Sequence, residues 1–408
     1  MDGGGTVRRR WVLTAGGTGL VLAAAGATAL PERTEAAPVP RLLNDASWHA
    51  ADDGADAAWL AEGVVPGAGG PYEAMVRQGL LDLRALTAAS GAVAAGPAPS
   101  WRYAWPRDSA FAAVALARTA HPGDADRVLG FLADVQLDDG GFEARYLLDG
   151  GGTPDGRRRQ DDGAGWALWA LREVLDADPS PASARARAEG ARALLEAATE
   201  FVLDRTGGGE ELPEPSPDYW ERRETRLTLG TAAPLVAGLR AAAAVHSRLG
   251  ERRRALAVGR AADRLRALVR ERFAPSGFAR YADLDEPPGG VDAAVAFLLP
   301  PFAARAEPDV LAALDRYQVQ ARRPAGGLAP GAGWRRDGVS WTPETAVVAH
   351  VAACSGRTGQ ARAWLDWLDA HRTSWGSIPE KVLADGSPAG PAPLGWSAAA
   401  AVLAVAAL

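Results

Sequence analysis

Apolar residues recur along this 408-residue chain with the spacing of helices. Twelve stretches carry apolar side chains at positions i, i+3 and i+4 or are apolar throughout, and no segment offers a convincing run of alternating, β-branched residues. The sequence therefore predicts an all-α protein. The predicted helices lie near residues 72–89, 108–120, 123–136, 162–177, 182–204, 226–249, 251–273, 290–303, 307–322, 343–355, 358–371 and 396–408.

The predicted helices are of two kinds that alternate along the chain. The odd-numbered ones, such as 182–204 and 251–273, carry Arg and Glu on one face, which is typical of helices with one face in water. The even-numbered ones, such as 108–120 and 343–355, are apolar nearly all round, as expected of helices surrounded by other helices. Six such pairs predict two concentric rings, an (α/α)6 barrel or toroid. An α-solenoid is the alternative, but the sequence shows no fixed repeat period.

The N-terminal residues have the layout of an export signal. Arg8 and Arg9 stand before an almost uncharged stretch that ends at Ala27-Thr28-Ala29, and this order is typical of a twin-arginine signal peptide. An uncleaved membrane anchor is the alternative, because Trp11–Ala29 is close to the length that crosses a bilayer. We expect export, to the exterior or to the cell envelope. The predicted organisation is a signal peptide at 1–29, an irregular lead-in at 30–70 and one globular domain at 71–408.

Composition and charge narrow the possible functions. With 48% hydrophobic and 23% charged residues, the chain can bury a large core, which excludes intrinsic disorder. A formal net charge of −6 argues against nucleic acid as a partner. Cys354 is the single cysteine, so an intramolecular disulfide and cysteine-based metal sites are excluded, and the five histidines show no metal-ligand spacing. We expect a monomer with a neutral ligand, in contact with membranes only through an uncleaved signal.

The loops before the even-numbered helices are unusually rich in Trp, Arg, Asp and Glu. In a toroid these loops open at one end, so their side chains would line a single pocket. A ligand with apolar CH faces and many hydroxyls, such as a sugar, would suit that surface. The competing interpretation is structural, because Trp is usually core in such a protein and an acidic residue at a helix start is usually a cap. The loops are Trp101–Asp108, Arg159–Gly163, Asp218–Glu224, Gly289–Asp292, Ser340–Glu344, and Ile378–Lys381 with Leu394–Trp396.

Taken in order, these loops resemble the motifs of glycoside hydrolase family 15, the glucoamylase and glucodextranase family. The matching segments are Tyr103-Ala104-Trp105-Pro106-Arg107-Asp108 (Y-x-W-x-R-D), Gln160-Asp161-Asp162-Gly163 (Q-x-D-G), Asp218-Tyr219-Trp220-Glu221 (D-L-W-E), Val291-Asp292-Ala293-Ala294 and Ser377-Ile378-Pro379-Glu380. The resemblance covers about residues 72–408. It implies an (α/α)6 barrel, in agreement with the helix pattern, and catalysis that requires no metal and no organic cofactor.

The resemblance also implies an inverting, exo-acting hydrolase that releases β-glucose from the non-reducing ends of short α-glucans. In such a reaction one carboxylic acid protonates the departing oxygen, and one carboxylate activates water on the opposite face. By resemblance, Glu221 is the general acid and Glu380 the general base. Burial against Trp220 would help to keep the acid protonated, and the neighbouring Arg222 would oppose it. The expected substrate-binding residues are Tyr103, Trp105, Arg107, Asp108, Asp162, Trp220, Arg222, Trp341 and Trp396.

Two positions depart from the family pattern. Arg222 stands where many members carry a second glutamate, and Tyr219 replaces a leucine, so the subsite for the leaving sugar differs. The linkage, whether α-1,4, α-1,6 or α,α-1,1, is left open. Because the sequence stops after the last predicted helix, we expect short soluble oligosaccharides instead of granules.

Two other functions compete with this interpretation. A catalytically silent glycan-binding protein could use the same toroid, and the discriminating observation is whether both carboxylates face one cavity. An isoprenoid cyclase is suggested by Gln136–Phe142, which resembles a Q-x-x-x-G-x-W/F repeat, and by the acidic pair Asp161-Asp162. That repeat occurs once, whereas cyclases repeat it.

Overall fold

The structure, a computed structural model, describes residues 53–282 and 290–408. The predicted signal peptide and much of the predicted lead-in lie outside the described residues. The first described element, α1 (Asp53–Glu62), falls where the sequence predicts an irregular segment, so that expectation is wrong for these residues. Tertiary contacts hold this helix: the Trp59 indole N–H donates to Asp124 Oδ2 at 2.8 Å, and its ring stacks on His121 with centroids 3.8 Å apart.

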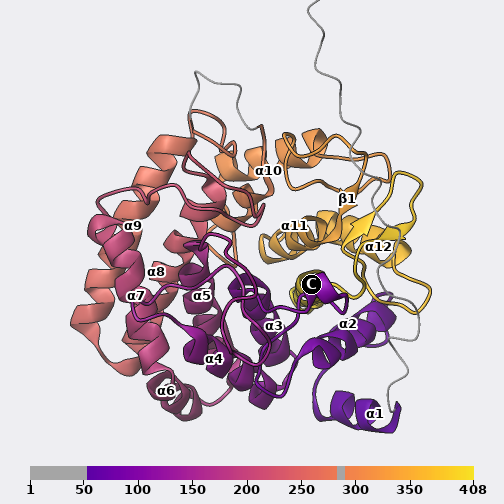
Figure 1. The fold of residues 1–408 in the computed structure, drawn as a ribbon, viewed down its shortest axis with the longest axis horizontal. Coiled ribbons are helices and arrows are strands. Elements are labelled where there is room, and N and C mark those ends of the chain that lie inside the picture. The colour runs from indigo at the N-terminus through magenta and orange to yellow at the C-terminus, as the bar shows by residue number, and fades with distance from the viewer. Residues whose placement is uncertain (1–52, 283–289) are drawn as a thin grey trace, which may run out of the picture. The chain divides into compact units, whose positions relative to one another are not determined.

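Six elements form a closed inner ring (Figure 1). They are α3 (Pro106–Arg118), α5 (Asp162–Ala177), α8 (Leu229–Leu249), the 3-10 helix η4 (Ala293–Leu298), α11 (Thr342–Cys354) and α13 (Gly395–Ala406). Each element contacts the next in this order, and α13 returns to contact α3. Nearly all their residues are buried, as the uniformly apolar sequence predicts. The described chain is therefore an all-α toroid of the (α/α)6 type, which confirms the predicted fold class.

The second layer consists of amphipathic helices that pack on the outside of this ring. They are α2 (Glu73–Leu86), α4 (Pro122–Val135), α6 (Pro181–Gly190), α7 (Arg192–Arg205), α9 (Arg252–Phe273), α10 (Pro308–Gln320) and α12 (Thr358–Ala370). Helix α4 packs on α3, α9 on α8, α12 on α11 and α2 on α13. Figure 1 shows the long α8 and α9 side by side.

Two predicted helices differ in the structure. The stretch 182–204 is divided at Ala191 into α6 and α7, directly after Gly190, a residue that weakens helices. The stretch 290–303 forms only the short η4, because Pro300 and Pro301 cannot continue a helix. Asp292 caps this element by accepting a hydrogen bond from the Ala294 amide at 2.9 Å.

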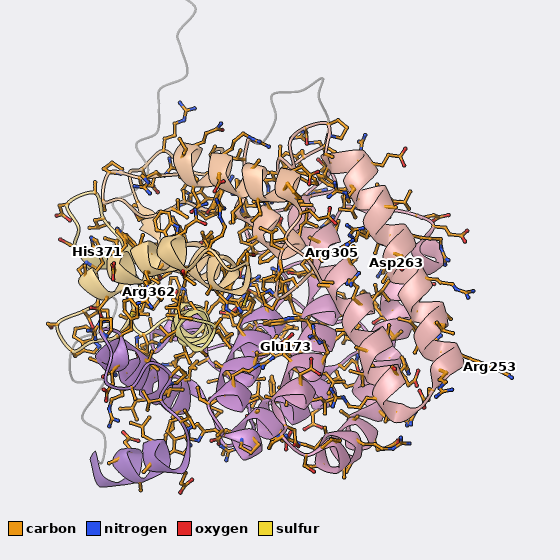
Figure 2. The ribbon with its side chains drawn as sticks, turned by 180° about the vertical axis from the view of Figure 1, so that it is seen from behind. Glu173, Arg253, Asp263, Arg305, Arg362 and His371 are labelled. Atoms are coloured by element: carbon orange, nitrogen blue, oxygen red, sulfur yellow. The ribbon has the colours of Figure 1, made fainter. Side chains whose placement is uncertain are left out.

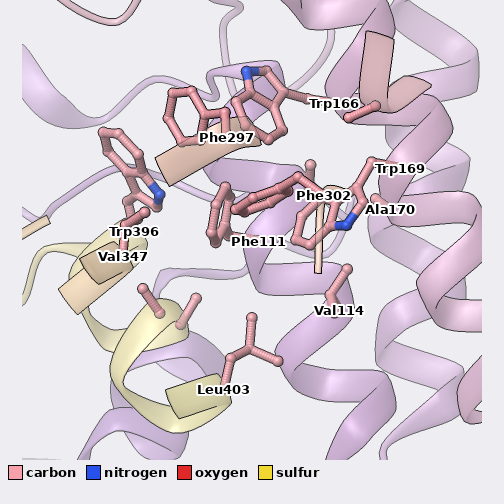
Figure 3. Close-up of a cluster of buried hydrophobic side chains, with 14 of the residues drawn as sticks. Phe111, Val114, Trp166, Trp169, Ala170, Phe297, Phe302, Val347, Trp396 and Leu403 are labelled. Carbon is pink, nitrogen blue, oxygen red and sulfur yellow. The ribbon is translucent and has the colours of Figure 1, made fainter. Parts of the chain in front are cut away.

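Close packing fills the barrel interior below its open end. Figure 3 shows a cluster of aromatic side chains in which the rings of Phe111 and Trp169 lie 4.9 Å apart and those of Trp169 and Phe302 lie 5.0 Å apart. Helices α5 and α8 approach closely at Gly165 and Gly238: a Cβ on Gly165 would lie 2.3 Å from a carbonyl oxygen of α8. Because the interior is filled in this way, the cavity with polar side chains lies at the end of the barrel where the loops enter the inner helices.

A small antiparallel sheet supports one of these loops. Strands β1 (Ser340–Trp341), β2 (Lys381–Val382) and β3 (Pro388–Ala389) pair in that order. The sheet therefore ties the chain before α11 to the segment that follows Glu380.

Helix α8 is, among the described residues, the one helix long and apolar enough to cross a membrane, and 83% of its most apolar 18-residue stretch is buried inside the protein.

Candidate active site

The loops that enter the inner helices open onto one cavity of about 350 Å³. The structure brings together eight of the eleven residues that the sequence analysis assigns to the site, and their roles stay predictions. These eight are Trp105, Arg107, Asp108, Trp220, Glu221, Trp341, Glu380 and Trp396. Other residues of the wall include Tyr219 and Glu344, which lie in loops expected at the pocket, and Arg145, Arg157 and Trp334, which lie outside those loops. Both predicted catalytic carboxylates thus face one cavity.

Glu221 stands on a tight turn at the edge of this cavity. Its amide donates to the Asp218 carbonyl at 2.7 Å, and its φ of +54° lies in the left-handed region that favours glycine. Its carboxylate forms an ion pair with Arg157 and lies 3.9 Å from Arg107 Nη2. Both arginines place positive charge beside the side chain that is expected to donate a proton. The hydrogen bond to Asp218 helps to hold this strained turn and so sets where the side chain emerges.

A wholly buried arginine supports the turn from below. Arg280 donates to Asp218 Oδ1 at 2.8 Å and to Glu224 Oε1 at 2.7 Å, and its Nη1 lies 3.3 Å from Asp292 Oδ2. Its guanidinium also lies over the Trp220 ring, 3.8 Å from the centroid. Because Asp218 in turn accepts from the Trp220 amide at 3.0 Å, this cluster fixes the residues just before Glu221. Sequence motifs did not single out Arg280, which lies far along the chain from the turn that it holds.

Glu380 is buried in the cavity wall, directly before strand β2 of the small sheet. The Trp101 indole donates to Glu380 Oε1 at 3.4 Å, and Lys381 Nζ lies 2.8 Å from Oε2. Burial raises the pKa of Glu380, although Lys381 and the Trp101 hydrogen bond act to lower it. Gly390 leaves room for this carboxylate, because a Cβ there would lie 2.6 Å from Oε2. The Lys381 ammonium group and the Trp101 N–H group suit a residue that must act as a carboxylate.

Glu344 is a third glutamate in the cavity wall, in the first turn of α11. Burial raises the pKa of Glu344 to about 8, and the nearby Glu380 adds to this effect while Arg107 opposes it. Burial also raises the pKa of Asp108 to about 6 despite its ion pair with Arg107 at 3.2 Å. Near neutral pH the wall therefore contains a protonated carboxyl group that can donate a hydrogen bond.

Several buried polar atoms of the wall have no hydrogen-bond partner within the described part of the protein. They include Nε and Nη1 of Arg107, Oε2 of Glu344 and the indole N–H groups of Trp105, Trp220, Trp334, Trp341 and Trp396. Buried polar groups are normally paired, so this density of unpaired donors and acceptors around one cavity indicates a surface that binds a polar ligand. Indole rings beside these groups provide apolar faces as well.

Three predicted site residues do not line the cavity. Tyr103 lies under the guanidinium of Arg145, 4.3 Å from the ring centroid. Asp162 is buried at the start of α5, where its Oδ2 accepts from the indole of Trp166 at 2.9 Å and burial raises its pKa to about 7. Arg222 lies over the Trp334 ring at 4.6 Å. These three lie outside the wall of the main cavity, with Arg222 in the wall of an adjoining hollow, and their roles in substrate binding stay predictions.

The segment that suggested a cyclase has a structural role. The Gln136 side chain donates to the Gly140 carbonyl at 2.9 Å and closes a turn. Gly140 has a φ of +83°, and a Cβ there would lie 1.9 Å from the Ala197 carbonyl oxygen. The glycine and glutamine of this motif are thus explained by the turn.

No protein-family model matches the sequence, and no curated protein matches it. Solved structures do match. A wild-type glycosidase aligns with a TM-score of 0.67 at 20% identity, over 87% of this chain and 98% of its own, and a variant in complex with glucose aligns equally well. A bacterial glucoamylase complexed with acarbose gives 0.70 at 18% identity, over 86% of this chain and 57% of its own. The glucoamylase from Saccharomycopsis fibuligera gives 0.62 at 16% identity, over 81% and 92%.

The chain has the fold of the glucoamylases. These neighbours confirm, at the level of the fold, the resemblance that the loop motifs indicate. At such identities the likeness establishes the architecture, and the activity has to be argued from the site.

Proposed function

We propose that this protein is an exported, inverting, exo-acting α-glucoside hydrolase that releases β-glucose from the non-reducing ends of short α-glucans. The observation that carries the proposal is the cavity wall, where unpaired buried donors and acceptors, indole faces and the carboxylates Glu221 and Glu380 converge. A neutral sugar offers the hydroxyls and CH faces that this wall would bind. The fold shared with glycosidases adds support.

In the proposed mechanism each side chain has one task. Glu221 donates its proton to the glycosidic oxygen as the bond from that oxygen to the anomeric carbon breaks. Glu380 removes a proton from a water molecule, whose oxygen attacks the anomeric carbon from the opposite face and inverts it. Arg107 and Asp108 hold hydroxyls of the terminal sugar, with the guanidinium of Arg107 itself held 4.6 Å over Trp396. No metal and no organic cofactor takes part in this scheme.

The proposal includes the expectations that the described structure does not test. The protein is exported through the twin-arginine signal of residues 1–29, acts as a monomer, binds neutral oligosaccharides and binds no nucleic acid. Proteolysis and N-terminal sequencing of the protein from culture medium and cell envelope fractions test the export and the cleavage after Ala29.

The test of the activity is glucose release from maltose, isomaltose and trehalose by the purified full-length protein. Proton NMR during the first minutes identifies the anomer before mutarotation. β-Glucose from one of these sugars supports the proposal and names the linkage. The departing glucose also contributes α-glucose, as an anomeric mixture from maltose and isomaltose and as α-glucose alone from trehalose. Formation of no β-glucose beyond that contribution overturns the inverting mechanism, and no release from any of the three overturns the α-glucosidase assignment.

Carboxamide variants test the two catalytic assignments. Glu221→Gln and Glu380→Gln each remove a proton donor or acceptor without changing the size of the side chain, so each should lower kcat by about 10²- to 10⁴-fold. Glu271→Gln, on the exposed face of α9, is the matched control and should keep full activity. Unchanged turnover in either cavity variant overturns that residue's role.

One observation favours a second candidate, a catalytically silent glycan-binding protein. The ion pair between Glu221 and Arg157 occupies the side chain that has to transfer a proton. Calorimetric titration with the same three sugars separates the candidates, because a silent binder takes up a sugar without releasing glucose.

A further inference from the structure

A second, smaller chamber of about 280 Å³ adjoins the cavity beside Glu221. The two hollows share two residues of their walls, Arg157 and Glu221. In the proposed reaction the general acid touches the oxygen between the terminal sugar and the departing group. With the terminal sugar held by Arg107 and Asp108 in the main cavity, the chamber beyond Glu221 is placed to receive the departing group.

The chamber differs from the main cavity in its charge. Its wall contains four arginines, Arg157, Arg158, Arg222 and Arg223, against a single carboxylate, Glu221. The main cavity carries four carboxyl groups beside its three arginines. The whole chain has a formal net charge of −6, so this concentration of positive charge runs against the composition of the protein.

Much of the positive charge of these four arginines has no acidic partner nearby in the described part of the chain. Arg157 is paired with Asp155 and with Glu221, and Arg222 lies over the Trp334 ring. Among the described residues, Arg158 and Arg223 form no ion pair, and both are exposed. Two exposed guanidinium groups without an ion pair to a described residue, and a third that is paired with carboxylates, thus surround a hollow of ligand size.

We propose that this chamber binds an anionic group, a carboxylate or a phosphate, on the departing part of the substrate, so that the expectation of a neutral ligand applies to the terminal sugar alone. The inference rests on the proposed function, since it assigns the substrate class of the same site. Arginine suits this role because its guanidinium is permanently charged and matches carboxylate and phosphate oxygens in two-point contacts. An anion in the chamber would also compete with Glu221 for Arg157, which would release the proton donor from its ion pair when substrate is bound.

Matched substrates test the charge directly. The pairs are maltitol with maltobionate and isomaltitol with isomaltobionate, in which the departing glucitol is replaced by gluconate and the glucosyl unit is unchanged. Maltitol carrying a phosphate on the terminal carbon of the glucitol distinguishes phosphate from carboxylate. For the linkage that the protein cleaves, kcat/KM should be about 5- to 20-fold higher for the anionic member at low salt, and the ratio should fall toward 1 at high salt.

Variants locate the effect. The double variant R158Q/R223Q should lower the anionic-to-neutral ratio of kcat/KM to about 1, and R158K/R223K should retain part of it, because the charge stays while the two-point contacts are lost. R252Q/R253Q is the matched control, because it removes the same charge from the exposed start of α9, beyond the end of α8 that lies away from the site loops. Figure 2 shows Arg253 projecting outward from this helix. The control should leave the ratio unchanged.

The outcomes separate this inference from the function on which it rests. Equal rates for both members of each pair, or a preference for the neutral member, overturn the anionic chamber and leave the hydrolase proposal intact. No hydrolysis of these pairs, nor of maltose, isomaltose or trehalose, overturns the hydrolase proposal. In that case, or where trehalose alone is cleaved, calorimetric binding of the same pairs decides the inference: tighter binding of the anionic member, lost in R158Q/R223Q, supports it, and equal binding refutes it.

Discussion

Replacing the buried arginine under the active-site turn should destabilise the protein and disturb catalysis together. Arg280 is completely buried and is the cation shared by Asp218, Glu224 and Asp292. Arg280→Met keeps a long apolar side chain against Trp220 and removes the charge. Three buried carboxyl groups then lose their counter-charge.

The size of the effect follows from that burial. Removing one partner of a buried ion pair costs about 3–5 kcal/mol, because an uncompensated charge is left in a medium of low polarity. The two short hydrogen bonds from Arg280, at 2.8 Å and 2.7 Å, agree with this range, since bonds to charged groups contribute about 1.5–3 kcal/mol each. We therefore expect the free energy of unfolding to fall by about 3–5 kcal/mol at pH 7.5.

The deficit should depend on pH in a stated direction. Burial raises the pKa of Asp292 to about 6 even with Arg280 present, and loss of the cation raises it further. A carboxyl group whose pKa is higher in the folded state binds its proton more tightly there, so the variant gains stability relative to the wild type as pH falls. The difference between the two proteins should be largest above pH 7 and smaller at pH 5.

The assay is urea unfolding followed by circular dichroism at pH 5, 6 and 7.5, with kcat and KM measured at each pH. Arg270→Gln is the control, since Arg270 also pairs with two carboxylates, Glu307 and Asp309, but lies partly exposed on α9. That change should cost at most about 1 kcal/mol. Adding Glu224→Gln to Arg280→Met should restore part of the loss. A variant within 1 kcal/mol of the wild type at pH 7.5, or a deficit that is the same at all three pH values, would refute the reasoning.

Four further substitutions have expected outcomes. Gly165→Ala should lower stability by about 1–3 kcal/mol, because its methyl group would lie 2.3 Å from a carbonyl oxygen of α8, whereas Gly130→Ala on α4, where a Cβ meets nothing within 4 Å, should raise it by about 0.5–1 kcal/mol in thermal melts. The wild type should lose stability as the pH rises from about 4.5 to 8, since the raised pKa of Glu344 makes the folded state the stronger proton binder over that interval. Glu344→Gln should make the free energy of unfolding depend less on pH there. Trp101→Phe should move the acidic limb of the kcat/KM profile to higher pH, because it removes a hydrogen bond that lowers the pKa of Glu380; an unmoved limb would contradict the role of Glu380 as the base.

The inner and outer helices could be predicted from the sequence because the signal is local. A helix buried on all sides needs apolar residues all round, and a helix on the outside needs one apolar face. Helices α3 and α11 satisfy the first condition and α9 the second, so their order alone indicates two concentric rings. The loop motifs around Glu221 and Glu380 are local as well, because each is a short string of residues at one helix entrance.

Local patterns were insufficient where distant segments decide the structure. Helix α1 depends on contacts of Trp59 with His121 and Asp124, and nothing in its own sequence requires them. Asp162 has the motif of a binding residue but is buried against Trp166, because the direction of a side chain depends on the packing of the whole ring.

By itself, the sequence determined the fold class and the end of the barrel at which polar residues gather. It also pointed to the two carboxylates that line one cavity, Glu221 and Glu380. Only the tertiary structure decided which charges surround them. Arg280 reaches the turn of Glu221 from a loop about sixty residues further along, and Arg157 reaches its carboxylate from the other direction. Electrostatic interactions act through space and depend on distance and burial, so the charge environment of a site is set by folding and leaves no periodic trace along the chain.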